Sequence, residues 1–218
     1  MEWNAEIAGI VWLSLRVSIV AALIGLSVGA PTGAWISMQA AWPKRAWLAI
    51  FSTLLAVPTV VVGLLVYMLL SRSGPFGWLE LLFTPAAIIV AQTLITLPVI
   101  VIFSYRACAG HWASHGEALR LDIRQSWRQI WHLMVMARAG IAMAFLVAFG
   151  RAVSEVGAVM IVGGNIRNAT RVMTTAITLE TRQGNFSVAA ALGVILLAIS
   201  FVVTLATWLL TRERARPL

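Results

Sequence analysis

Long apolar segments without charged residues are the feature that most constrains how this chain folds. Four of them cover residues 17–38, 46–71, 81–105 and 183–211, and a fifth, residues 139–162, is interrupted only by Arg151 and Glu155. Each exceeds the roughly 18–20 residues that a helix needs to cross a bilayer. Charged residues make up only 11% of the 218 residues, against roughly 25% in soluble domains. We therefore predict one all-α polytopic membrane domain over residues 1–218, with about five transmembrane helices.

The basic residues are distributed unevenly between the predicted loops. Five spans place the two ends of the chain on opposite sides of the membrane. One side then holds Lys44, Arg45, Arg106, Arg120, Arg124, Arg128, Arg138, Arg212, Arg214 and Arg216, and the other holds Arg72, Arg167, Arg171 and Arg182. Short cytoplasmic loops collect Lys and Arg, so the N-terminus is predicted outside and the C-terminus in the cytoplasm. The basic excess therefore indicates topology, and we expect no nucleic-acid binding.

Several other kinds of chemistry find no support in the sequence. The start, "MEWNAEIAG", is acidic and lacks the positive n-region of a secretory signal. The only lysine is Lys44, and no glycine-rich phosphate-binding loop is present, so we expect ATP to be bound by a partner and no cofactor in this chain. Cys108, His111 and His115 could supply metal ligands, but histidines beside a loop are more often solvated, so we expect no metal site.

Glycines and prolines mark the packing and bending of the predicted helices. Gly25, Gly29 and Gly33 recur at every fourth position and form a flat face for close helix contact, which we interpret as packing within the subunit. Proline removes a backbone hydrogen bond and can kink a helix, and Pro31, Pro58 and Pro98 each fall inside a predicted span.

Two polar segments interrupt the apolar pattern. The inner one, about residues 107–137, contains a predicted amphipathic helix with an apolar stripe and arginines beside it. The stripe consists of Leu119, Ile123, Trp127, Ile130 and Met134. This helix fits a lipid surface or a docking surface for a cytoplasmic partner about equally well. The outer segment, about residues 163–186, carries five threonines and three arginines; these could donate to an oxyanion, but we favour a solvated loop.

One ionisable pair lies inside a predicted span. Arg151 and Glu155 are one helical turn apart, a spacing that allows them to neutralise each other. Charges within the membrane usually pair and mark a pathway or a locked junction. A salt bridge that fixes this helix is at least as well supported as direct contact with a substrate.

The stretch from Gly150 to Glu180, "GRAVSEVGAVMIVGGNIRNATRVMTTAITLE", resembles the membrane subunits of oxyanion ABC importers, and its "EVGAVMIVGGNI" and "TTAITLET" are most similar to the tungstate permeases of that family. Candidate translocation or structural residues on this stretch are Arg151, Glu155, Gly157, Gly164 and Asn165. The resemblance implies a type I importer permease fold. It covers nearly the whole chain after about residue 10.

The resemblance also assigns a role to the inner segment. In this family, a Glu-Ala-Ala…Gly loop forms a coupling helix that docks on the ATPase subunit. Glu117 and Ala118 match its start, whereas Leu119 stands in place of the second alanine and Ile123 in place of the glycine. The predicted docking residues are Glu117, Ala118, Leu119, Arg120, Leu121, Asp122, Ile123 and Arg124.

The implied protein is a permease in the plasma membrane of a prokaryote, not an enzyme. It would work as a homodimer among membrane lipids, with two ATPase subunits inside and an oxyanion-binding protein outside. Tungstate is the favoured substrate and molybdate the alternative. Two other classes are less well supported by the residues: a membrane enzyme acting on lipid, which would need a cluster of Asp, His or Ser, and a structural subunit that binds a soluble partner through residues 117–134.

Overall fold

The computed structural model describes residues 2–214 of the chain, and the side chains of residues 6–210. Every element in this part of the chain is helical. The elements are α1 (Glu2–Ser37), α2 (Ala41–Ala56), α3 (Thr59–Leu70), the 3₁₀ turn η1 (Gly77–Leu79), α4 (Pro85–Asp122), α5 (Ser126–Met136), α6 (Arg138–Val153), α7 (Gly157–Gly163), α8 (Met173–Arg182) and α9 (Phe186–Arg214). Of the basic residues used to predict topology, Arg216 and the side chains of Arg212 and Arg214 lie outside the described residues.

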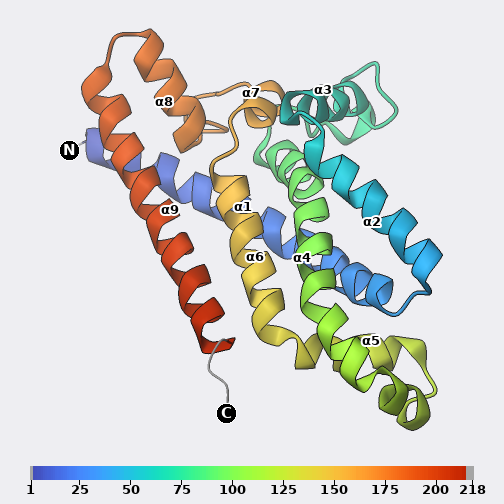
Figure 1. Cartoon of the computed structure of the whole chain (residues 1–218). Helices are drawn as coiled ribbons and strands as arrows, with labels where there is room; N and C mark the ends of the chain where they lie inside the picture. The colour runs from blue at the N-terminus through green and yellow to red at the C-terminus, as the bar shows by residue number, and fades with distance from the viewer. Residues whose placement is uncertain (1, 215–218) are drawn as a thin grey trace.

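The long helices run side by side, with the short helices gathered at their two ends (Figure 1). Helices α1 and α4 make the most extensive contact, α6 packs against both, and α9 packs against α6 and α8. The N-terminus, α3, α7 and α8 lie at one end of the molecule, here called the α8 end. The turn between α1 and α2, the last part of α4 and all of α5 lie at the opposite end, called the α5 end.

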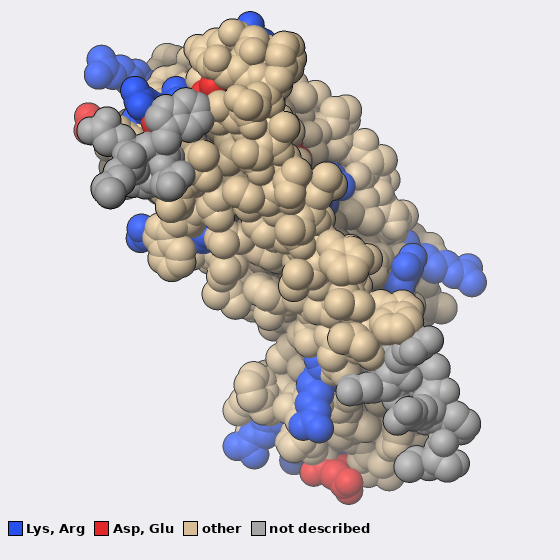
Figure 2. Space-filling view, turned by 90° about the vertical axis from the view of Figure 1, so that its left-hand side faces the viewer, with Lys and Arg blue, Asp and Glu red and all other residues tan. Residues whose placement is uncertain are grey.

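The helices are long and apolar enough for a membrane protein. Helices α1, α4 and α9 each provide a candidate span, and the total rises to five if each of two bent pairs, α2 with α3 and α5 with α6, crosses as one unit. Uncharged residues cover most of the face in Figure 2. The prediction of an all-helical membrane domain is confirmed. The predicted number of about five spans agrees with the larger of the two counts, in which each bent pair is one span.

Two segments predicted as continuous spans are broken. The apolar run of residues 46–71 bends by 93° between α2 and α3, at Val57 and Pro58, because proline has no N–H to continue the ladder. The run of residues 139–162 divides into α6 and α7 at residues 154–156. In contrast, α1 continues through Pro31 and α4 through Pro98, so only one of the three prolines ends a helix.

The glycine stripe of α1 allows α4 to approach closely, as predicted for packing within the subunit. A Cβ added to Gly25 or Gly29 would lie 2.8 Å from the side chain of Ile100. A Cβ at Gly33 would lie 2.6 Å from the carbonyl oxygen of Val101 and 2.7 Å from the backbone nitrogen of Tyr105. Since backbone atoms cannot rotate away as a side chain can, Gly33 is the position where α1 and α4 tolerate a side chain least.

We therefore expect Gly33→Ala to destabilise the protein by about 1–3 kcal/mol, the usual cost of overpacking a core. The matched control is Gly110→Ala in α4, where nothing lies within 4 Å of the added Cβ and the better helix propensity of alanine favours the variant. Thermal unfolding of the two variants in detergent, followed by size-exclusion chromatography, separates these effects. Equal melting temperatures would contradict the close α1–α4 contact.

Candidate functional site

The break between α6 and α7 is stabilised by Glu155, whose side chain is buried. The backbone N–H of Ala158 donates to Glu155 Oε1 at 3.2 Å, so the carboxylate binds the first turn of α7, where free N–H groups and the helix dipole favour an anion. A salt bridge with Arg151, one of the two alternatives considered from the sequence, does not form: neither ion pair within residues 6–210 joins these two side chains. The reason is that α6 ends at Val153, which removes the helical spacing on which the prediction depends.

The other predicted residues of this stretch are packed into the junction. A Cβ on Gly157 would lie 2.7 Å from Val60 Cγ2 of α3. Gly164 ends α7 with φ of +67°, a left-handed conformation that favours glycine, and Asn165 follows with φ of +52° and a buried Oδ1 that has no partner. Gly157 and Gly164 are thus parts of the packed junction around α7.

Part of the segment that follows α7 is buried and is held by threonines. Thr170 is fully buried, and its hydroxyl donates to the carbonyl of Gly163 and accepts from the N–H of Ile166 at 3.0 Å. Thr174 donates to the carbonyl of Glu155 at 2.8 Å. Because these hydroxyls bind backbone groups, they are not available to an anion, and the prediction of a solvated segment is wrong for residues 170–176.

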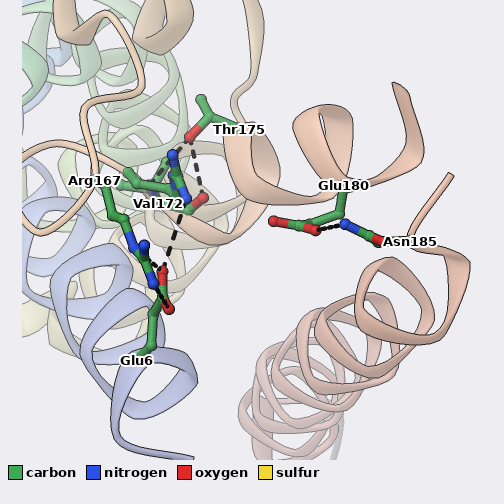
Figure 3. Close-up of polar contacts among 7 residues, drawn as sticks. Glu6, Arg167, Val172, Thr175, Glu180 and Asn185 are labelled. Atoms are coloured by element: carbon green, nitrogen blue, oxygen red, sulfur yellow. Dashed lines mark hydrogen bonds and ion pairs between the residues drawn. The ribbon is translucent and has the colours of Figure 1, made fainter. Parts of the chain in front are cut away.

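Helix α8 is also attached to α1. Ser14 Oγ accepts a hydrogen bond of 2.7 Å from the backbone N–H of Met173. At the first turn of α8, the hydroxyl of Thr175 lies 3.1 Å from both the N–H and the carbonyl of Val172 (Figure 3). Sequence reasoning missed Ser14, although a serine within an apolar run was a signal that it has a buried partner.

An ion pair joins the start of α1 to the segment between α7 and α8. Arg167 Nε and Nη2 donate to the two carboxylate oxygens of Glu6 at 2.9 and 2.6 Å (Figure 3), and Arg171 Nη1 lies 3.8 Å from Glu6 Oε1. The side chain of Arg167 is 66% exposed, so this pair contributes little to stability. It does fix the position of the loop relative to α1 at the α8 end.

Arg151 lies in the last turn of α6, beside a buried glutamine that sequence reasoning did not single out. Gln92 Nε2 of α4 donates to the carbonyl of Ala152 at 2.9 Å, while Gln92 Oε1 and Arg151 Nε are both enclosed without a hydrogen-bond partner. Gln92 is a polar amide in an otherwise apolar run, and this feature of the sequence could have indicated a buried residue with a hydrogen-bond partner. The junction of α4 and α6 therefore contains an uncompensated cation.

At the α5 end, the predicted amphipathic helix is two helices. Helix α4 ends at Asp122 and α5 begins at Ser126. Gln129 Nε2 donates to the carbonyl of Ile123 at 2.5 Å, which closes the turn. Ile123 has φ of −124° and ψ of 103°, an extended conformation open to any residue, so the turn forms without the glycine of the family pattern.

The predicted docking residues lie mostly on the surface. Leu119 and Ile123 are half-buried, and the other six are exposed: Glu117, Ala118, Arg120, Leu121, Asp122 and Arg124. Leu121 is 87% exposed. Trp127, predicted on the apolar stripe, is instead 64% exposed, because the turn at residues 123–125 rotates α5 relative to α4. An apolar and basic surface, formed by Leu121, Trp127, Trp131 and the arginines around them, is therefore available to a partner.

Helix α5 is fixed to the body of the protein on its other side. Leu133 is fully buried in a cluster with Ala34 of α1 and Cys108 of α4, and Ile130 and Met134 pack against this cluster. Within residues 6–210, no three His, Cys, Asp or Glu side chains lie close enough together to hold a metal ion. The buried Leu133 therefore holds α5 against α1 and α4.

The sequence profile of the family "Binding-protein-dependent transport system inner membrane component" matches residues 15–215. The chain belongs to this family of transport-system membrane subunits, and its fold is the type I permease fold of ABC importers. It is thus a multi-pass membrane protein.

Individual relatives match over most of their length. The chain is 42% identical to a "Probable anion ABC transporter permease protein" of Haloferax volcanii, over 86% of this chain and 83% of that protein. It is 36% identical to a tungstate uptake system permease protein of Peptoclostridium acidaminophilum, over 98% and 93%. It is 30% identical to a molybdenum transport system permease protein of Escherichia coli, over 98% and 96%.

The carboxylate cap of α7 leads to a prediction about Glu155. Glu155→Ala removes the acceptor for the N–H of Ala158 and is expected to cost about 0.5–2 kcal/mol of stability, as for other helix caps. Glu155→Gln keeps a side-chain oxygen at that position and is expected to cost less. Hydrogen exchange of the α7 amides provides the measurement, and equal protection in both variants would contradict the capping role.

Proposed function

We propose that this chain is the permease subunit of an ATP-driven importer for tungstate. The observation that carries the proposal is similarity over nearly the full length to a tungstate permease, at 36% identity, against 30% for a molybdenum permease of comparable coverage. An extracytoplasmic binding protein would deliver the anion, and a separate ATPase subunit would bind and hydrolyse ATP.

Molybdate is the alternative substrate. The two anions have nearly the same size and charge, and the threonine hydroxyls between residues 170 and 181 are all hydrogen-bonded to backbone atoms. These hydroxyls therefore offer no site in the permease that would separate the anions. Selectivity would then reside in the binding protein, and similarity alone favours tungstate.

The proposed orientation follows from the charge at the two ends. The α5 end carries Lys44, Arg45, Arg120, Arg124 and Arg128, which favours the cytoplasmic side. The N-terminus and α8 would then face the binding protein. Two copies of the chain would enclose the pathway between them, as in the homodimer that the sequence resemblance implies.

Helix α4 connects the ATPase side to the pathway. Its 38 residues span about 57 Å at 1.5 Å per residue, nearly twice the roughly 30 Å hydrocarbon core. Its last turns therefore project beyond the membrane and end at the docking surface. When ATP closes the ATPase dimer, a push on Leu121 and α5 would move α4 as a rigid element, because α5 is anchored through the buried Leu133. This shifts the population between inward-open and outward-open states.

Deletion of the gene tests the substrate. Cells without it, grown on trace tungstate and molybdate together, are expected to lose cell tungsten selectively, measured by elemental analysis. Loss of molybdenum instead would keep the mechanism and change the substrate. No change in either element would reject the proposed function.

A substitution at Leu121 tests the docking surface. Leu121→Arg is expected to weaken association with the ATPase subunit by about tenfold or more, as for a central interface residue, and to reduce ATP-driven uptake in parallel. The matched control is Trp42→Arg, also at the α5 end and 81% exposed but outside residues 107–137. Co-purification of the ATPase subunit with each variant gives the answer; equal recovery would place the contact elsewhere.

A further inference from the structure

Arg151 is a cation within the membrane-spanning part of the fold, and its depth can be estimated from its neighbours. The carbonyl of Ala152 accepts a hydrogen bond from Gln92, which lies seven residues after the first residue of α4, Pro85. Seven residues correspond to about 10 Å of helix, or about a third of the hydrocarbon thickness. Arg151 therefore lies at the level of the second turn of the candidate span that begins at Pro85, and not at the level of the loop before that span.

Another arginine, Arg16 of α1, provides a comparison. The carbonyl of Ala21 accepts a hydrogen bond from Thr93, so α1 and α4 run in parallel at this level. Arg16 precedes Ala21 by five residues and is exposed, which places it about one helical turn nearer the α8 end than Arg151. A long side chain at that height reaches the interface by snorkelling, whereas Arg151 is one turn deeper.

The charge of Arg151 is not compensated within the described subunit. The nearest carboxylate in the sequence, Glu155, instead binds the first turn of α7. No hydrogen bond or ion pair joins the Arg151 side chain to any residue in the described part of the chain, and its Nε is enclosed without a partner. Arg151 as a whole is nevertheless only half-buried, so the residue is not sealed completely between the packed helices.

Ser154 follows Arg151 by three residues, lies just beyond the end of α6 at Val153, and is exposed. A bare arginine facing acyl chains at this depth is costly, and such residues almost always face a bundle interior or a water-filled cavity. The face at the end of α6, formed by the half-buried Arg151 and the exposed Ser154, is therefore poorly suited to lipid and well suited to an aqueous pathway.

We propose that this face of α6 lines the translocation pathway and that the Arg151 guanidinium binds the oxyanion in transit. The inference rests on the proposed function, since it takes the transported species to be an anion. A guanidinium presents several donors in a planar fork that fits two oxygens of an oxyanion. Its attraction to a dianion beside the protein is stronger than in bulk water, which makes Arg151 a selectivity residue for charge while leaving the choice between similar oxyanions to the binding protein.

The first experiment tests whether this face is accessible to water, and it needs no substrate. Ser154→Cys is placed in a Cys108→Ala background, assembled with the ATPase subunit and binding protein in liposomes, and exposed to an anionic methanethiosulfonate reagent. Labelling is expected without nucleotide or with ATP and vanadate, because the reagent reacts only in water. Leu197→Cys is the control on α9, 71% exposed on an apolar surface, and is expected to stay unlabelled. If Ser154→Cys resists labelling in every nucleotide state, the face is not a pathway.

The second experiment asks whether the charge matters. Arg151→Gln is expected to reduce tungstate uptake about tenfold, the order expected for loss of a charge-assisted contact, while ATPase activity and assembly are kept. Arg151→Lys should retain most of the uptake because it keeps the charge. Full uptake by Arg151→Gln, or equal losses in both variants, would overturn the role of the charge. If the wild-type complex transports neither tungstate nor molybdate, the proposed substrate fails while the labelling result still decides whether the face is aqueous.

Discussion

Where a helix breaks within the membrane part, the freed backbone N–H and carbonyl groups must find hydrogen-bond partners within the protein. The structure of the α8 end depends on such hydrogen bonds. Lipid offers no hydrogen bonds, so an unpaired N–H or carbonyl there costs several kcal/mol. Glu155 supplies an acceptor to the first turn of α7, and Thr170 and Ser14 bind the segment that leads into α8. These buried polar side chains allow the chain to turn within an apolar body.

This requirement also explains how Arg151 comes to be unpaired. Glu155 is used for the start of α7, and it therefore does not neutralise the arginine that precedes it. The break between α6 and α7 therefore leaves Arg151 without a carboxylate partner in the described part of the chain. Glu155 and Arg151 therefore differ in their surroundings: the carboxylate is bonded to the first turn of α7, whereas Arg151 Nε has no hydrogen-bond partner.

The two ends of the molecule are linked by α4. Its first part carries Gln92 at the level of Arg151, and its last turns end at the exposed Leu121 beside α5. Close packing on the glycines of α1 makes this long helix part of a rigid pair, because Gly33 brings the two backbones into contact. Under the proposed function, a displacement at Leu121 would therefore reach the junction through this closely packed pair of helices.

The sequence by itself determined the helical membrane class, the close face of Gly25, Gly29 and Gly33, and the segments that form the two ends, because apolar run length and small-residue spacing are local properties. Tertiary structure decided the breaks at Pro58 and at residues 154–156, the turn at Ile123, and the partner of Glu155. A break in a helix frees backbone N–H and carbonyl groups, and residues far away in the sequence can bond them, as Ser14 does for the N–H of Met173. A continuous apolar run therefore does not reveal where such a break will occur. Arg151 and Glu155 could form an ion pair at their spacing only if the helix continued between them. The end of α6 at Val153 is a property of the folded chain.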